Sequence, residues 1–213
     1  MCGINGIIYK KEHPSINEIA KMNSAINHRG PDDEGVLAFE NILLGHVRLS
    51  IQDLSKKGRQ PMSFDGNSWI IFNGEIYNFK KLRKNLEKIG IFFKSNSDTE
   101  VLLKLYQTKK EKMLDDIEGI FSLVIYDKIE KVIFLARDRF GVKPLYYINF
   151  NNILVFASEV KAFLPLINAL NIPWFINQRL ISEYLVYRSN TGENTLIKSV
   201  KSLREGSYAK FFG

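Results

Sequence analysis

The sequence predicts an α+β fold in which two mainly antiparallel sheets pack face to face. Two stretches, 120–125 and 132–136, are apolar at nearly every position instead of at alternate positions. The short connection 127–131 makes them antiparallel neighbours. Strands of this kind need cover on both faces, which a second sheet provides on one side and helices on the other.

Length and composition favour one domain in a reducing compartment. A chain of 213 residues with 45% hydrophobic and 25% charged residues is typical of a single globular domain. One cysteine excludes an internal disulfide framework and suits the cytoplasm, which is the expected location. The sequence contains neither an apolar run of about 20 residues nor a signal-peptide pattern, so no membrane partner is expected.

Net charge alone raises nucleic acid as a partner. The charge is +7, but the lysines are scattered and the densest cluster, 80–84, lies on a predicted helix whose other face is apolar. A solvated helix face explains that cluster, and we predict no nucleic-acid partner. The three histidines (His13, His28 and His46) lack the spacing of metal ligands, so no metal site is predicted.

The N-terminus holds the first candidate for chemistry. Residues 3–9 read as a strand with Cys2, the only cysteine, at its head and directly behind Met1. Removal of Met1 would give Cys2 both a thiol and a free α-amine, and such an amine serves as the base for its own side chain. The ordinary pKa values are about 7.7–8.0 for the amine and about 8.5 for the thiol, so modest tuning by the surroundings would make the pair titrate near neutrality. Position alone leaves open the alternative of an inert, buried cysteine.

The next segment reads as a capped helix. Ser15 and Glu18 form a capping box, and the apolar stripe that follows ends near Asn27. Met22 falls outside that stripe. The polar, Gly- and Pro-containing stretch 28–35 is a loop, which we expect its acidic residues and Arg29 to hold together.

Two strands, 36–39 and 42–47, then surround a short turn and deliver Arg48. A guanidinium group is well suited to bind a carboxylate through two hydrogen bonds. The alternative for Arg48 is an ordinary surface ion pair. The following stretch 52–66 is a loop by composition.

A strand at 68–72 leads into Asn73 and Gly74. Asn-Gly is a strong hairpin signal, but no returning strand follows, because Asn78 opens a helix as its N-cap. A side-chain amide beside a glycine N–H supplies two donors close together, as an oxyanion hole requires.

A second capping box, Ser97 with Glu100, opens the helix of 101–106. Asp98 then lies in the first turn, where the helix dipole favours an acid without any function. The same carboxylate can also project to a substrate ammonium group. The remaining predicted elements are strands at 117–126, 132–136, 145–148, 154–157 and 207–211 and helices at 160–164 and 179–187.

Six motifs occur in a fixed order along the chain: Cys2-Gly3-Ile4-x-Gly6, His28-Arg29-Gly30-Pro31-Asp32, Arg48-Leu49-Ser50-Ile51, Asn73-Gly74-Glu75-Ile76-Tyr77-Asn78, Ser97-Asp98-x-Glu100 and Arg137-Asp138-Arg139-Phe140-Gly141-Val142-Lys143-Pro144-Leu145-Tyr146-Tyr147. Together they resemble the glutaminase domain of class II, or N-terminal nucleophile, glutamine amidotransferases of the glutamine-hydrolysing asparagine synthetase type. The resemblance covers 1–213. One departure is 203–206, where such domains usually carry a Pro-rich turn.

The resemblance implies the four-layer αββα sandwich of N-terminal nucleophile hydrolases. It also implies roles for individual residues. Cys2 would attack the side-chain amide of L-glutamine, and Asn73 and Gly74 would hold the oxyanion. Arg48 would bind the substrate α-carboxylate, while Glu75 and Asp98 take its α-ammonium group. The substrate-binding residues implied are Arg48, Leu49, Ser50, Ile51, Gln52, Asn73, Gly74, Glu75 and Asp98, whereas Arg29 and 137–147 are read as structural.

By the same resemblance the chain would release glutamate and ammonia, the ammonia serving asparagine synthesis from aspartate. That step belongs to a C-terminal ATP-dependent synthetase domain or a separate synthetase subunit, and its Ser-Gly-Gly-x-Asp-Ser loop is missing from this chain. ATP and Mg are expected only there, so no cofactor is predicted here. The alternatives are amidation of a sugar or peptide acceptor, and a non-catalytic docking domain. A homodimer stays open.

Overall fold

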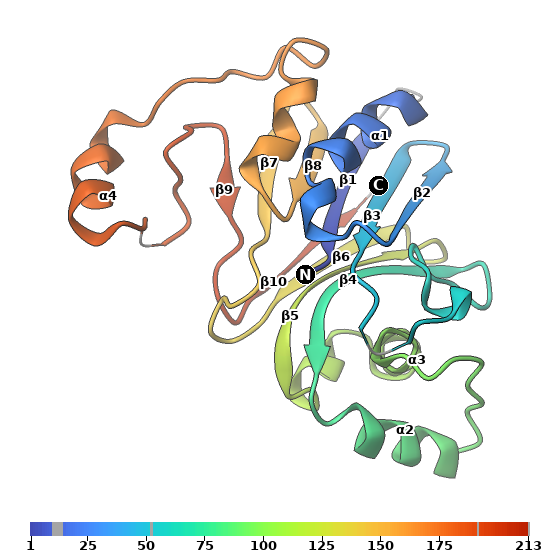
Figure 1. Cartoon of the computed structure of the whole chain (residues 1–213). Helices are drawn as coiled ribbons and strands as arrows, with labels where there is room; N and C mark the ends of the chain where they lie inside the picture. The colour runs from blue at the N-terminus through green and yellow to red at the C-terminus, as the bar shows by residue number, and fades with distance from the viewer. Residues whose placement is uncertain (10–14, 52, 191, 213) are drawn as a thin grey trace.

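The computed structural model describes residues 1–9, 15–51, 53–190 and 192–212, and its strands form two antiparallel sheets (Figure 1). The first sheet has the order β2-β3-β1-β8-β7-β9 and the second the order β10-β6-β5-β4. Their bounds are β1 Gly3–Tyr9, β2 Asp33–Phe39, β3 Ile42–Arg48, β4 Ser68–Ile76, β5 Gly119–Asp127, β6 Val132–Arg137, β7 Tyr146–Phe150, β8 Ile153–Ala157, β9 Lys201–Ser202 and β10 Tyr208–Phe212.

Helices cover the outer face of each sheet, as Figure 1 shows. Helix α1 (Ile16–Ala25) and the 3-10 helix η4 (Val160–Leu166) pack on the first sheet, and α2 (Phe79–Lys88) and α3 (Asp98–Lys109) lie over the second. A third apolar cluster fills the space between the sheets. The predicted four-layer αββα sandwich is therefore confirmed. The remaining helical segments are η1 Asn27–Arg29, η2 Lys56–Gly58, η3 Lys110–Asp115, η5 Gln178–Leu180 and α4 Ile181–Tyr187.

Strand alternation decides which side chains face the inter-sheet layer. In β1, Ile4 and Ile8 belong to the inter-sheet cluster, whereas Ile7 packs under α1. In β4, Ile71 faces between the sheets. Successive side chains of a strand point to opposite faces. Steps of two residues therefore lead from Ile4 to Cys2, and from Ile71 to Asn73, on the same face. In β3, the same steps lead from Leu44 to His46 and Arg48. These four polar side chains lie at one end of the inter-sheet layer.

Several strands extend beyond their sequence-based bounds. The strand predicted at 68–72 continues to Ile76, so Asn73 and Gly74 lie inside β4 and no hairpin forms there. The reason is tertiary, because these residues pair with Ser122 and Phe121 of β5. The two-residue strand β9 lies where none was predicted. No helix in the described part of the chain is long and apolar enough to cross a membrane.

The first predicted capping box is only half present. Ser15 caps α1 by accepting a hydrogen bond from Asn17 N (3.3 Å), but the Glu18 carboxylate accepts from the Tyr9 hydroxyl instead (2.5 Å). The prediction that Met22 falls outside the apolar stripe was wrong, because its side chain is fully buried between α1 and the first sheet.

At the N-termini of α2 and α3, residues distant in sequence also compete with the local capping hydrogen bonds. Asn78 precedes α2 but its side chain makes no cap, because it bonds to Asp116 O (2.8 Å) and Glu118 N (3.1 Å). Ser97 does cap α3 by accepting from Glu100 N (3.2 Å). The Glu100 carboxylate is held by the residues at 94 and 95 and does not return to the cap.

Candidate active site

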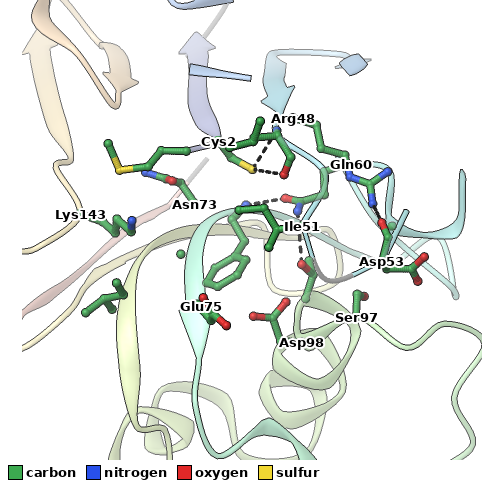
Figure 2. A pocket seen from close by; sticks show the side chains of 17 residues that line it. Cys2, Arg48, Ile51, Asp53, Gln60, Asn73, Glu75, Ser97, Asp98 and Lys143 are labelled. Carbon is green, nitrogen blue, oxygen red and sulfur yellow. Dashed lines mark hydrogen bonds between the residues drawn. The ribbon is translucent and has the colours of Figure 1, made fainter. Parts of the chain in front are cut away.

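A pocket opens at the end of the inter-sheet layer where the polar side chains gather (Figure 2). Its wall combines the head of β1, the end of β3 with the loop after it, β4, the first turn of α3, and the β6–β7 loop. Segments far apart in sequence thus meet here, and Cys2, Arg48, Asn73, Gly74, Glu75 and Asp98 all line the pocket.

Cys2 is partly buried and bound to the backbone of Leu49. Its Sγ donates to Leu49 O (3.6 Å) and accepts from Leu49 N (3.4 Å). Burial raises the pKa of the Cys2 thiol, while the hydrogen bond from Leu49 and the positive N-terminus and Arg48 act against that rise. With Met1 in place, the pKa of the thiol therefore lies above its ordinary value. A mature N-terminus that begins at Cys2 is expected to shift it in the opposite direction, towards neutrality.

The outer edge of β4 carries a row of backbone donors. Phe121, opposite Gly74, exchanges both of its backbone hydrogen bonds with Asp138, so Gly74 and Phe121 form a non-hydrogen-bonded pair. The Gly74 N–H consequently points away from β5, in the same direction as those of Phe72 and Ile76. Phe72 N donates to Gln60 (2.6 Å), and Ile76 N donates to Asp98 (3.1 Å).

Between those two bonds the Gly74 N–H has no hydrogen-bond partner among the described residues, and it lies at the pocket wall. The Asn73 amide beside it is 1% exposed, and its Nδ2 also lacks a partner within the described structure. Buried donors are normally satisfied. Two adjacent unsatisfied donors at one cavity are the arrangement that an oxyanion requires.

Glycine at position 74 is required by the close approach of β5. A Cβ built there would lie 2.7 Å from Phe121 Cα and would also meet the Ile120 carbonyl oxygen. A side chain at this position would therefore push β4 away from β5 and displace the donor pair.

Arg48 is 7% exposed and its guanidinium is oriented by the loop that follows β3. Nη1 donates to Ser55 O (3.1 Å), and Nη2 donates to Asp53 O. These bonds use two of the five donors of the guanidinium. The group remains part of the pocket wall, where it can bind a carboxylate.

Asp98 lies in the first turn of α3, as expected, and is 6% exposed. Burial raises the pKa of Asp98 to about 6, and the charge of Glu75 adds to this rise, while hydrogen bonds from Ile76 N and Thr99 N oppose it. Two carboxyl groups at one side of a pocket favour a bound cation. The pair therefore suits an ammonium group of a ligand.

The stretch after Arg48 contributes unevenly to the pocket. Leu49 and Ile51 line it, whereas Ser50 is not part of the wall and its N–H donates to Asp32 Oδ2 (2.7 Å). Ile51 is 68% exposed, so it forms the rim. Gln52, also predicted to bind substrate, lies outside the described residues.

Two predictions about neighbouring residues change with the structure. Arg29 does not bind the acids of its own loop. Its Nε donates to Cys2 O (2.9 Å), and its Nη1 pairs with Glu159 (2.8 Å), 130 residues away. Arg29 therefore helps to hold the backbone of Cys2 in place. Lys143, read as structural, lines the pocket.

Gln60 and His46 are supporting residues that sequence reasoning missed. Gln60 binds Phe72 N and also donates to Thr99 Oγ1 (3.3 Å), joining β4 to α3. His46 Nε2 lies 3.2 Å from Phe72 O and ties β3 to β4 across the sheets. Burial lowers the pKa of His46 to about 4, so the neutral ring donates this bond. No local sequence pattern indicates these roles, because Gln60 and His46 each bind residues that are distant in sequence.

No group of three or more His, Cys, Asp or Glu side chains within the described ranges could hold a metal ion. The two-sheet sandwich and a cysteine at the head of its first strand, facing a pair of free donors, define an N-terminal nucleophile domain. A family model described as a glutamine amidotransferase domain matches residues 1–212, so the chain belongs to the class II glutamine amidotransferase family.

Sequence relatives are longer proteins. The chain is 39% identical to asparagine synthetase (glutamine-hydrolyzing) 1 of Bacillus subtilis over 97% of this chain and 33% of that protein. It is 33% identical to amidase chry2 of Gibberella zeae over 98% of this chain and 32% of that protein. The chain thus spans about a third of the length of these curated relatives.

Solved structures agree on the fold. Glutamine phosphoribosylpyrophosphate (PRPP) amidotransferase from B. subtilis superimposes with a TM-score of 0.67 at 22% identity, covering 78% of this chain and 43% of that one. At this identity the likeness shows the sandwich, and the site must be argued from the residues present.

Proposed function

We propose that this chain hydrolyses the side-chain amide of L-glutamine through a thioester on Cys2 and supplies ammonia for the synthesis of asparagine. The observation that carries the glutaminase step is that the Cys2 thiol, Asn73 Nδ2 and the Gly74 N–H line one pocket, and that neither donor has a partner among the described residues. Individual donors of this kind contribute roughly 3–4 kcal/mol to other enzymes.

The opposite side of the pocket suits the amino-acid end of glutamine. Arg48 would bind the α-carboxylate, and Asp98 with Glu75 would bind the α-ammonium group. The Ile51 main chain would close the rim. Removal of Met1 would expose the Cys2 α-amine, which takes the thiol proton as sulfur attacks and delivers it to the departing ammonia. Water then releases glutamate. These steps draw on protein groups alone.

The test is release of glutamate from glutamine, after mass spectrometry has established that Met1 is absent. Wild type should release glutamate, and Cys2→Ala should show no measurable rate, because no thioester forms. Cys2→Ala keeps a small second residue and hence processing of Met1. Ile129→Ala, at a 74% exposed position between β5 and β6, serves as a matched control that should keep the wild-type rate. Equal rates in wild type and Cys2→Ala would overturn the proposal.

The ammonia acceptor is the finer part of the proposal. Asparagine synthetase relatives favour aspartate, amidated by an ATP- and Mg-dependent synthetase domain or subunit. The amidases chry2 and chyE favour a second candidate, the same glutaminase chemistry with another acceptor. We also propose a cytoplasmic location for a chain that supplies ammonia to asparagine synthesis. Glutamine labelled with ¹⁵N in the amide, supplied to the protein with its synthetase partner, ATP, Mg and aspartate, should give labelled asparagine. Labelled ammonia released from the glutamine amide without labelled asparagine would favour the second candidate.

A further inference from the structure

The β6–β7 loop is built around two charged side chains that the proposed function does not use. Arg137 Nε donates to Lys143 O and its Nη2 donates to Gly141 O, both at 2.8 Å. The Asp138 carboxylate accepts from three N–H groups within 140–143, at 2.9–3.1 Å. Asp138 is 1% exposed. The shape of the loop is therefore determined from within.

The same carboxylate connects this loop to the strand behind the oxyanion donors. Asp138 accepts from Phe121 N (3.2 Å), and its own N–H donates to Phe121 O (2.8 Å). Phe121 lies opposite Gly74 in the β4–β5 register. The position of the loop is thus coupled to that of the donor pair.

The loop presents Lys143 to the pocket. The residue is 9% exposed and lines the cavity together with Met1, Cys2 and Asn73. Figure 2 shows its side chain on the side of the pocket where Asn73 lies, with the nitrogen directed towards the cavity. Within the described structure, the hydrogen bonds of Lys143 are made by its backbone N–H and carbonyl, and no ion pair involves its ammonium group. Placing an unpaired ammonium group in a pocket wall costs free energy.

We propose that Lys143 is a positioning residue whose positive charge keeps the Cys2 α-amine, exposed when Met1 is removed, in its neutral form. This rests on the proposed function, in which that amine is the base. An ordinary α-amine has a pKa of about 7.7–8.0 and is mostly protonated at neutral pH. A like charge disfavours the protonated form, so the neighbouring ammonium group makes more of the free base available.

Other charged groups also act on this region, since Arg48 and Asp98 affect the Cys2 thiol in opposite directions. Arg29 is paired with Glu159, and Arg48 lies on the Leu49 side of the thiol with its guanidinium bound to the following loop. Acidic groups at the same pocket favour the protonated amine and oppose Lys143. Among the described residues, the charged side chains that line this pocket or contact Cys2 are Arg29 from η1, Arg48 from β3, Asp53 from the next loop, Glu75 from β4, Asp98 from α3 and Lys143 from the β6–β7 loop.

The first test is the pH dependence of kcat/KM for glutamine. Lys143→Met removes the charge and keeps the length, so the acid limb should move up by about half to one pH unit at low salt. Lys143→Arg keeps the charge and should leave that limb near the wild-type position. Lys128→Met is the matched control, because it removes one exposed lysine charge at the far end of β5. It should not move the limb.

The second test titrates the amine itself, without glutamine chemistry. In a Cys2→Ala background, the pH dependence of α-amine acetylation by a small reagent gives the amine pKa, which Lys143→Met should raise by the same amount as the kinetic limb. An unchanged amine pKa, or a loss of rate that is equal at every pH, would overturn the proposal. Retention of Met1 would overturn both proposals. An inactive wild type with a shifted amine pKa would refute the glutaminase step and leave the role of Lys143 standing.

Discussion

Helices α3 and α4 are both rich in apolar residues, yet their environments differ completely. Helix α3 buries eight of its twelve residues, including Leu102 and Tyr106, against the second sheet. Helix α4 buries none of its seven residues, and Leu185, Val186 and Tyr187 are each more than 60% exposed. Figure 1 shows α4 standing away from both sheets. An apolar pattern therefore predicts a helix, but the surface opposite decides whether that helix is buried.

The difference also separates two kinds of duty. Helix α3 stabilises the core and at its first turn delivers Asp98 to the pocket. The apolar side chains of α4 are exposed, as are those of Phe175 and Ile176 in the preceding segment, so they add little to the core. Three substitutions test this comparison, through the free energy of unfolding measured in urea.

The largest effect is expected for Leu102→Ala in α3. Leu102 is fully buried in the cluster between α3 and the second sheet. Truncation removes transfer free energy and leaves a cavity, so the free energy of unfolding should fall by about 2–5 kcal/mol. A loss below about 1 kcal/mol would mean that the helix layer collapses around the gap and that α3 is less rigidly packed than its burial indicates.

Asp98→Asn should have a smaller effect of opposite sign. The pKa of Asp98 is about 6 in the folded chain against an ordinary 3.8, so the fold binds the proton more tightly than the unfolded chain does. Stability therefore falls as pH rises from about 4 to about 6, and the ionised carboxylate remains a cost above that range. About two pKa units at about 1.4 kcal/mol each set the upper end of an expected gain on the order of 1–3 kcal/mol at pH 8.

The same variant should lose glutamine hydrolysis by at least roughly 100-fold in kcat/KM, because the substrate ammonium group loses a charged partner. Asp115→Asn, at an exposed position on η3, is the matched control and should change neither quantity. A variant that is less stable than wild type at pH 8 would show that the hydrogen bond from Ile76 N outweighs the burial of charge.

The smallest effect is expected for Leu185→Ala in α4. The residue is 64% exposed, and leucine and alanine are both good helix formers, so the free energy of unfolding should change by less than about 0.5 kcal/mol. A loss above about 1 kcal/mol would contradict the comparison, because it would require α4 to be packed.

Local pattern predicted most of the strands but not the geometry of the donors. Strand 3–9 was predicted with its observed bounds, because apolar residues recur over its whole length. The freedom of the Gly74 N–H depends on Phe121 bonding to Asp138, a side chain after β6. Such a dependence joins residues that are dozens of positions apart and leaves no local trace.

The supporting residues were missed for the same reason. We expected Arg29 to bind the acidic residues of its own loop, but it binds Glu159, which is 130 positions away in the sequence. Lys143 was read as structural, because nothing in its neighbours indicates that the loop turns it towards Cys2. Roles for Cys2, Arg48 and Asp98 came from the order of motifs, and these residues do line one pocket.

The alternation of β1 and β4 has a consequence for mutational tolerance. Cys2 and Asn73 meet because each occupies the inter-sheet parity of its strand. Substitutions within these strands alter packing by degrees. A one-residue insertion or deletion between Cys2 and Ile4 has an all-or-none effect on the site. It turns the thiol to the α1 side of the sheet while leaving the sandwich intact. Length variation in homologous chains should therefore be excluded from this short segment and tolerated in the loops.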